Sequence, residues 1–346
     1  MRKITLGSAE IGGESPVYLI AEIGTAAGKS LDDAKELIKI SKKVGFDCVK
    51  FQTFNTSKIV SSKASSAKHF GKSSVREVFS DMQFPREYYS EIIKYCKSEN
   101  ISFLSSVFDL DSLDFLLKFD NIGFKVAAFE LGDVFLLEKL AETKLPIILS
   151  TGMASIGQVE EAINLIEKKN NKSIIILHTV SSYPADPEAY NLKVIENIKN
   201  CFGYPVGISD HTENDIVPII STALGSCMLE KHVTLDREGK RVDDFFSLDE
   251  KMMKSLVKSV RTTEKIIGDG RKRITKQEIE ISNNFSLSLV TKRKIKKGEK
   301  LSRENLEIKR CGNGIDPKHF DIVVGLKCLA EINEDTPIEW KDLIKS

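Results

Sequence analysis

The chain has 346 residues, 41% of them hydrophobic and 29% charged, and its 51 basic and 50 acidic side chains leave a formal net charge of +1. This balance supplies no general attraction for nucleic acid or for an anionic membrane surface. Since no apolar run approaches roughly twenty residues and no signal-peptide core opens the chain, we expect a cytoplasmic globular protein without nucleic-acid or membrane partners.

The first residues predict a small hairpin. Residues 2 to 14 alternate in polarity around Gly7 and end in Gly12 and Gly13, which are typical turn residues. The main fold begins only after this hairpin. We therefore expect the hairpin to cover one end of that fold.

Eight apolar, β-branched segments follow, and helical sequence such as residues 31–44, 88–98 and 156–169 separates them. They lack polar alternation, as strands of a parallel sheet buried on both faces do. The pattern predicts an α/β fold, a (β/α)8 TIM barrel over residues 1–270. A doubly wound open sheet is the alternative, although residues 24–28 do not match its glycine-rich phosphate fingerprint. The expected strands are residues 17–23, 48–53, 101–106, 122–127, 146–151, 174–179, 204–209 and 227–232.

The sequence changes character after the last barrel helix, expected over residues 248–267. Residues 271–284 are charged and polar, which predicts a linker that would span on the order of 45 Å if extended. Residues 285–346 combine short apolar segments with glycine turns and predict a small β-rich domain. Its expected strands are residues 286–291, 306–309, 323–326 and 336–338, with a turn at 297–299.

Polar residues stand at the carboxyl ends of the expected strands, where a (β/α)8 barrel gathers its functional groups. His211 and His232 end the last two strands, and imidazole nitrogen beside carboxylate oxygen suits a divalent metal. The pair predicts a metal site. Two half-buried structural histidines are the alternative reading.

Two lysines share these strand ends with several hydroxyl groups. Lys50 and Lys125 beside serines favour a small, densely anionic ligand such as a phosphorylated carboxylate. The alternative is a pair of snorkelling or salt-bridged lysines. Glu22 and Glu230 are candidates for general acid or base, or for support of the metal, with a structural ion pair to either lysine as the alternative.

Taken together, the ordered motifs resemble the sialic acid synthase family, whose members make nonulosonic acids from phosphoenolpyruvate and an N-acylated amino hexose. The resemblance covers nearly the whole chain, and its last part is similar to the family's antifreeze-like (SAF) domain. The barrel motifs are residues 21–24 (AEIG), 50–53 (KFQT), 103–106 (FLSS), 150–153 (STGM), 183–184 (YP), 209–212 (SDHT) and 229–232 (LEKH). The SAF-like motifs are residues 295–299 (IKKGE), 304–306 (ENL) and 309–314 (KRCGNG).

The resemblance implies roles for individual residues. It implies that His211 and His232 bind Mn²⁺ or Mg²⁺, and that Lys50, Ser106, Lys125, Ser150 and Ser209 hold phosphoenolpyruvate. Together with the two glutamates considered above, the expected catalytic residues are Glu22, Lys50, Lys125 and Glu230. The resemblance also implies a homodimer with exchanged carboxyl-terminal domains, so that Arg310 reaches the partner's barrel. The implied substrate-binding residues are Gln52, Ser106, Ser150, Ser181, Tyr183, Ser209, Asp243 and Arg310.

Departures from the family pattern keep other functions open. Thr25-Ala26-Ala27 stands where the family has an Asn-His pair, and Ala128 replaces a serine. A non-catalytic sugar-binding relative is therefore one alternative. A Schiff-base aldolase or lyase, with Lys125 or Lys50 as nucleophile, is another. Residues 235–249 lack the Pro-Gly-Pro-Asp stretch of the family's neuraminate synthases, so the chain looks closer to its synthases of di-N-acetylated sugars, pseudaminic acid especially. The sequence does not name the hexose.

Overall fold

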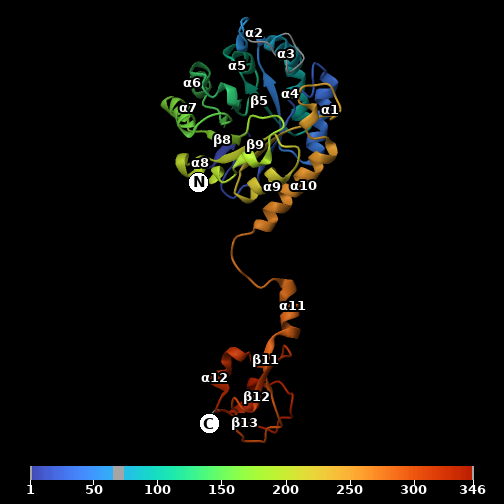
Figure 1. The fold of residues 1–346 in the computed structure, drawn as a ribbon, viewed down its shortest axis with the longest axis vertical. Coiled ribbons are helices and arrows are strands. Elements are labelled where there is room, and N and C mark those ends of the chain that lie inside the picture. Colours follow the sequence, from blue (N-terminus) through green and yellow to red (C-terminus); the bar gives the residue numbers. More distant parts are fainter. Residues whose placement is uncertain (1, 65–73, 345–346) are drawn as a thin grey trace. The chain divides into compact units, whose positions relative to one another are not determined.

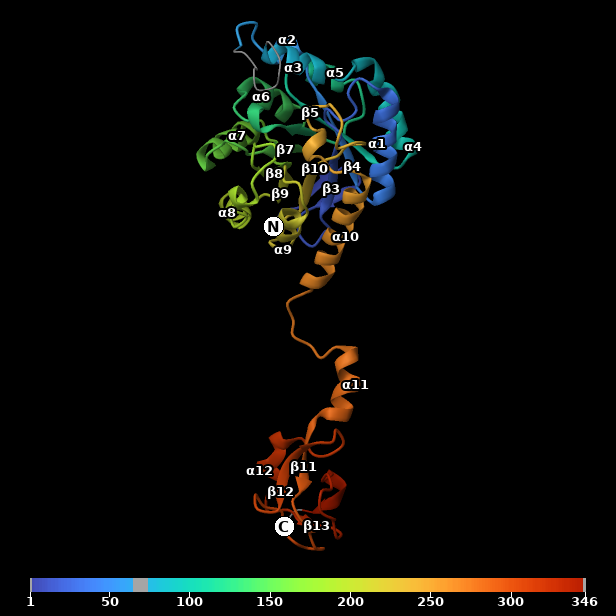
Figure 2. The same ribbon diagram turned by 45° about the vertical axis from the view of Figure 1, so that its right-hand side comes forward.

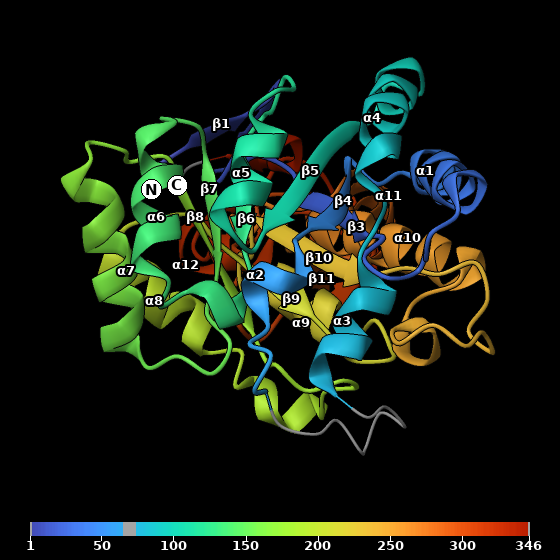
Figure 3. The ribbon, with the colours of Figure 1, turned by 90° about the horizontal axis from the view of Figure 1, so that it is seen from above.

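Eight parallel strands close into a barrel in the order β10-β3-β4-β5-β6-β7-β8-β9. We describe residues 2–64 and 74–344 of a computed structural model of the chain. Figure 3 shows the helices around the barrel strands. The predicted (β/α)8 barrel is confirmed, and each predicted strand coincides with an observed one to within three residues at either end. The strands are β3 (Tyr18–Glu22), β4 (Cys48–Thr53), β5 (Ser102–Val107), β6 (Phe124–Val126), β7 (Ile147–Ser150), β8 (Ile174–Thr179), β9 (Val206–Asp210) and β10 (Met228–His232).

The helices of this unit lie outside the strands, and Figures 1 and 2 show α1 and α4 beside β4 and β5. Helix α1 begins at the N-cap Ser30, whose side chain accepts from the Asp33 amide, and ends at Gly45 in the left-handed conformation. Apolar faces of the helices and outward strand residues form the main core. The helices are α1 (Leu31–Val44), α2 (Thr56–Ile59), α3 (Val75–Met82), α4 (Tyr89–Ser98), α5 (Leu110–Leu116), α6 (Val134–Glu142), α7 (Ile156–Lys168), α8 (Val194–Phe202), α9 (Ile216–Ala223) and α10 (Glu250–Ile267).

The barrel interior is apolar at the amino ends of the strands and polar at their carboxyl ends. On β3, Tyr18 and Ile20 belong to an apolar cluster inside the barrel, and the period of two then brings Glu22 to the same interior near the mouth. On β10, Met228 belongs to that cluster, and Glu230 and His232 follow it toward the mouth. The apolar layer thus stabilises the barrel, and the polar layer at the mouth can bind ligands or take part in a reaction.

The predicted hairpin is confirmed as β1 (Ile4–Leu6) paired with β2 (Ala9–Ile11). Ile4, Leu6 and Ile11 are buried in the apolar cluster at the amino ends of the barrel strands. The hairpin therefore covers the end of the barrel opposite the polar mouth.

The chain divides into two compact units, residues 1–268 and 269–346. The second unit has its own core, which includes Leu289, Leu301 and Leu306. The predicted strand at residues 323–326 is wrong, because Phe320–Val323 forms a single helical turn and Gly325 adopts a φ of 87°. The elements of this unit are α11 (Lys276–Phe285), β11 (Leu287–Thr291), β12 (Leu306–Arg310), α12 (Phe320–Val323), β13 (Lys327–Cys328) and β14 (Leu343–Ile344).

Two further segments of this unit differ from expectation. Residues 336–338 form no named strand; they pair with β11 through an isolated bridge between Val290 and Pro337 and through backbone hydrogen bonds on either side of it. Helix α11 occupies most of the predicted linker, with a capping box between Thr275 and Glu278 and no buried residue. Its ten residues rise only about 15 Å as a helix, so the linker reaches less far than an extended chain would. No helix within residues 2–64 and 74–344 combines the length and apolar character needed to cross a membrane.

Candidate active site

A cavity of about 770 Å³ lies at the carboxyl ends of the barrel strands, and its floor is polar. Glu22 does not line this cavity but contacts Lys50, which does. Arg310 lies in the second unit, exposed at the end of β12. The other predicted site residues all border the cavity: Lys50, Gln52, Ser106, Lys125, Ser150, Ser181, Tyr183, Ser209, His211, Glu230, His232 and Asp243.

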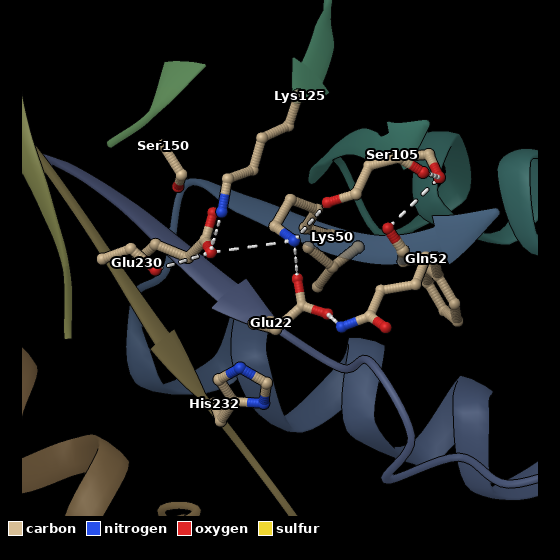
Figure 4. A network of polar contacts seen from close by, with 12 residues as sticks. Glu22, Lys50, Gln52, Ser105, Lys125, Ser150, Glu230 and His232 are labelled. Carbon is tan, nitrogen blue, oxygen red and sulfur yellow. Dashed lines mark hydrogen bonds and ion pairs between the residues drawn. The ribbon is translucent and has the colours of Figure 1, made fainter. Parts of the chain in front are cut away.

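Lys50 and Lys125 project from β4 and β6, and both point toward Glu230 (Figure 4). The Lys50 ammonium forms an ion pair with Glu22, lies 3.7 Å from Glu230 Oε1 and donates to Ser106 Oγ at 2.8 Å. Lys125 Nζ donates to Glu230 Oε1 at 2.6 Å. The ion pairs between lysine and glutamate, which were the alternative reading of these residues, are thus present at the edge of the cavity.

The four charged side chains share a buried network, which shifts the pKa values of Lys50, Lys125 and Glu230. Burial would raise the pKa of Glu230, but Lys125 and Lys50 lower it to about 2, so this carboxylate stays ionised. Burial lowers the pKa of Lys50, yet Glu22 and Glu230 outweigh that effect and the net change is upward. Burial lowers the pKa of Lys125, and Glu230 offsets this only in part. The two lysines therefore differ in proton affinity although they share a carboxylate.

Three buried polar atoms at the cavity lack a hydrogen-bond partner among the described residues: Glu130 Oε2, Ser181 Oγ and Glu230 Oε2. A buried polar atom without a partner costs about 1–3 kcal/mol. Glu130 was not among the predicted site residues, and burial raises its pKa to about 8. These atoms favour a ligand that is rich in hydrogen-bonding groups.

His211 and His232 meet at the mouth, with their ring centroids 5.4 Å apart. His211 Nδ1 lies 2.8 Å from the Val180 carbonyl, which can only accept, so Nδ1 carries the proton and Nε2 keeps its lone pair. Burial, reinforced by His232, lowers the pKa of His211 to about 3 and keeps the ring neutral. Neutral imidazole is the form that binds metal.

The two rings fit a divalent cation that takes its remaining ligands from substrate or water. Within the described part of the chain, no group of three or more His, Cys, Asp or Glu side chains is arranged to hold a metal ion. A site built on two imidazoles would thus leave several coordination positions open, as a catalytic metal requires.

Asp243 supports His232 from the loop after β10. Its Oδ2 lies 3.4 Å from His232 Nδ1 and accepts a hydrogen bond from Thr25 Oγ1 at 2.8 Å. Burial opposes ionisation of Asp243, but His232 and Thr25 lower its pKa below the usual value. A carboxylate in this position fixes the orientation of the His232 ring, as carboxylates do for histidines that bind metals. Sequence reasoning missed Thr25, because it stands in the motif that departs from the family pattern.

The loop after β3, which carries Thr25, shows what stands in place of the family's Asn-His pair. Ala26 and Ala27 are buried in the outer core and do not border the cavity. Arg241 donates to the Ala26 carbonyl and pairs with Asp33, which ties this loop to the segment that carries Asp243. The loop after β3 therefore stays fixed to the segment that carries Asp243, although it lacks the Asn-His pair.

One wall of the cavity is apolar and was not predicted from the sequence. It comes from short helices and loops above the strands, whose side chains show no spacing pattern that points to a site. Its members include Ile59, Val78, Phe79, Met82, Phe108 and Phe245.

Two protein-family models match successive segments of the chain. The NeuB family model matches residues 37–272 and the SAF domain model matches residues 288–344. An N,N'-diacetyllegionaminic acid synthase of Campylobacter jejuni is 36% identical over 324 residues, which cover 92% of this chain and 97% of that protein. A pseudaminic acid synthase of C. jejuni is 33% identical, covering 95% of this chain and 97% of the relative.

The chain is also similar to a solved structure. The N-acetylneuraminic acid synthetase of Leptospira borgpetersenii, in complex with citrate, superposes with a TM-score of 0.73 at 30% identity over 81% of this chain and 95% of that one. The eight-stranded barrel, the polar mouth and these matches over two successive segments agree with one another. The chain belongs to the NeuB family and carries an SAF domain after its barrel.

Proposed function

We propose that this enzyme condenses phosphoenolpyruvate with an N-acylated amino hexose to give a nine-carbon nonulosonic acid and phosphate. The observation that carries the proposal is that two buried lysines, three buried serines and two buried histidines border one cavity. Relatives named as nonulosonic acid synthases, at 33% and 36% identity, support the general reaction.

In the proposed reaction the enol carbon of phosphoenolpyruvate bonds to the aldehyde carbon of the open-chain sugar, whose oxygen takes up a proton. Water adds at the oxygen-bearing enol carbon, and phosphate leaves with cleavage of the carbon–oxygen bond. A divalent cation, Mn²⁺ or Mg²⁺, held by His211 and His232 would polarise the aldehyde.

The proposed anion subsite is formed by Lys50, Lys125 and the hydroxyl groups of Ser106, Ser150 and Ser209. Ammonium groups as point charges and hydroxyl donors suit phosphate and carboxylate oxygens. Glu230 accepts from Lys125 and from Ser209 Oγ, the latter at 2.9 Å, and so holds both donors in place. Because Glu230 stays ionised, we assign it to orientation of these groups; Glu22 does the same for Lys50 and for Gln52, which donates to Glu22 Oε1 at 3.0 Å.

The proposed sugar subsite lies toward Gln52, Ser181, Tyr183 and Asp243. The Tyr183 ring packs 4.3 Å from the His211 ring, between centroids. The apolar residues that line the same cavity suit acyl methyl groups, so we propose a doubly N-acylated hexose, as the name of the N,N'-diacetyllegionaminic acid synthase also suggests. The six cysteines form no disulfide, which fits the reducing cytoplasm that we propose as the location.

A Schiff-base aldolase has one observation in its favour, the lowered pKa of Lys125. Against it, the Lys125 ammonium is hydrogen-bonded to a carboxylate that stays ionised, and a protonated amine is no nucleophile. Borohydride trapping with pyruvate separates the two mechanisms, because covalent labelling of Lys125 together with activity in EDTA would favour the aldolase.

The proposal is tested by mixing phosphoenolpyruvate, Mn²⁺ and a panel of N-acetylated and di-N-acetylated hexoses with the purified protein. We expect phosphate to be released only when phosphoenolpyruvate and one of these hexoses are both present. Ligand binding without phosphate release across the panel would favour the non-catalytic sugar-binding relative that Ala26, Ala27 and Ala128 left open.

Glu130 should make binding of phosphoenolpyruvate depend on pH. Its carboxyl group is neutral below its pKa of about 8 and becomes a negative charge beside the cavity above it. We expect the KM for phosphoenolpyruvate to rise up to about tenfold between pH 7 and pH 9. In the Glu130→Gln variant this rise should be absent. A variant whose KM climbs as steeply as that of the wild type would rule out Glu130 as the source.

We further propose a homodimer in which the SAF domain of one chain covers the barrel mouth of its partner and supplies Arg310. Helix α11 buries no side chain within its own unit, and Ile279, Ile281 and Phe285 are exposed along it. Such apolar side chains gain from contact with a second chain, and a covered mouth excludes water from the reaction.

Mixing an Arg310→Ala chain with a Lys125→Met chain tests this arrangement. Random subunit exchange makes half of the dimers mixed, and each mixed dimer has one intact site of two, so we expect about a quarter of the wild-type activity from two inactive parents. No recovery after exchange has been verified by mass spectrometry would contradict the proposed sharing of the site.

A further inference from the structure

Two buried charges stand beside the site residues and take no part in the reaction described above. Asp210 precedes His211 and Lys231 precedes His232, and each is 1% exposed. Because side chains alternate along a strand, Asp210 and Lys231 leave the barrel on the side opposite Ser209 and Glu230, whose side chains face the cavity. Burying two charges costs free energy unless they are paired and hydrogen-bonded, so their contacts decide what they do.

The Lys231 ammonium bridges β10 to the loop that follows β9. It pairs with Asp210 and donates to the Thr212 carbonyl, and it lies 3.2 Å from the Asn214 carbonyl and 3.3 Å from Thr212 Oγ1. Asp210 in turn accepts from the Thr212 amide and hydroxyl, both at 3.0 Å. These partners are the last residue of β9 and two residues of the loop that follows it.

His211 lies in this loop, and its backbone is fixed there. Its amide donates to Tyr190 Oη at 2.8 Å, and its carbonyl accepts from the Ala185 amide at 3.0 Å. The His211 Nδ1 can donate to the Val180 carbonyl only while the loop backbone keeps this conformation. The position of the His211 ring therefore depends on the backbone that Lys231 holds.

We propose that Asp210 and Lys231 are positioning residues that set the spacing and the tautomer of His211 relative to His232. Each member of the ion pair is joined by a peptide bond to one of the two histidines, so the pair ties the two strand ends together from behind. The inference rests on the proposed function, in which these two rings hold the divalent cation. Replacing a residue that holds a metal ligand in place typically lowers metal affinity by about 10- to 100-fold.

The test compares Lys231→Met with the double variant Asp210→Asn/Lys231→Met. The single variant leaves Asp210 charged and buried and should lose stability, whereas the double variant removes both charges and should regain much of it. We expect both to bind Mn²⁺ about 10- to 100-fold more weakly than the wild type in calorimetry below their unfolding temperatures. Lys231→Arg should restore part of the affinity. A double variant with wild-type stability and wild-type affinity would overturn the proposal.

Arg261→Met is the matched control. Arg261 pairs with Asp47 at 3.1 Å and donates to the Val17 carbonyl, near the amino ends of β3 and β4 and so at the other end of the barrel. Its loss should lower stability without changing Mn²⁺ affinity. A weakening equal to that of Lys231→Met would show that general loosening of the barrel, not positioning, is the cause, and would also overturn the proposal.

A metal-free readout separates this inference from the proposed function. With selective ¹⁵N labelling of the five histidines, nitrogen shifts report which nitrogen of His211 carries the proton. We expect Nδ1 in the wild type and a mixture of tautomers in both Lys231→Met variants. If the wild type binds no Mn²⁺ through His211 and His232, the metal function fails, while the tautomer result still decides for or against positioning.

Discussion

Removal of divalent metal by EDTA, or replacement of His232 by alanine, is expected to lower turnover by about 10³-fold or more. A Lewis acid contributes several kcal/mol to the transition state, and each 1.4 kcal/mol corresponds to a factor of ten in rate. The structure supports the site because His211 is neutral and its Nδ1 proton is held by a backbone carbonyl, which leaves Nε2 for a metal. Added Mn²⁺ should restore the EDTA-treated wild type but not the variant.

His319→Ala serves as the control for this experiment. His319 packs against Trp340 in the second unit, with ring centroids 5.6 Å apart, and is not among the residues that border the cavity. Its loss should leave the Mn²⁺ requirement unchanged. A His232→Ala protein that binds Mn²⁺ and turns over normally would remove the basis of the metal site.

Replacement of Lys125 by methionine should also lower activity strongly, and it should have a second effect on stability. The change removes an ammonium group that we place on phosphoenolpyruvate, and charge-assisted hydrogen bonds of this kind contribute about 1.5–3 kcal/mol each. It also leaves Glu230 buried with its Lys125 partner missing, which costs about 3–5 kcal/mol of folding free energy. We expect kcat/KM for phosphoenolpyruvate to fall by about 10²-fold or more, together with a lower unfolding temperature.

The double variant Lys125→Met/Glu230→Gln separates the two effects. It removes the uncompensated carboxylate charge and should recover much of the stability measured by denaturant unfolding, while activity stays low. Recovery of both stability and kcat/KM would mean that Lys125 acts only as a structural partner of Glu230, which is the ion-pair reading of these residues.

The barrel and its polar mouth were predictable because a strand buried on both faces has a simple pattern. Residues such as Tyr18 and Ile20 pack in the dry interior of the barrel. A glutamate two residues later, at the end of the same strand, points to a functional site. The pairing of Lys50 and Lys125 with the two glutamates was an open alternative, and the structure shows it. Distances across a barrel cannot be derived from spacing along one strand.

Other features depend on contacts that no local pattern contains. Thr25 reaches Asp243 across 218 positions of sequence, and the apolar wall of the cavity comes from helices whose lengths and directions are set by packing. The short segment at residues 323–326 was ambiguous between strand and helix, and the left-handed Gly325 ends the helical turn that forms there. Helix α11 was missed because its charged sequence is also typical of a linker.

The position of isotope from phosphoenolpyruvate labelled with ¹⁸O in the bridging oxygen tests the central claim most directly. The protein, Mn²⁺ and the hexose that gives turnover are incubated with the labelled compound, and both products are analysed by mass spectrometry. Cleavage of the carbon–oxygen bond predicts that the label leaves in inorganic phosphate, while the new carbonyl oxygen of the nonulosonic acid comes from water. Label retained in the nonulosonic acid would mean that the phosphorus–oxygen bond is broken instead, and would contradict the proposed condensation.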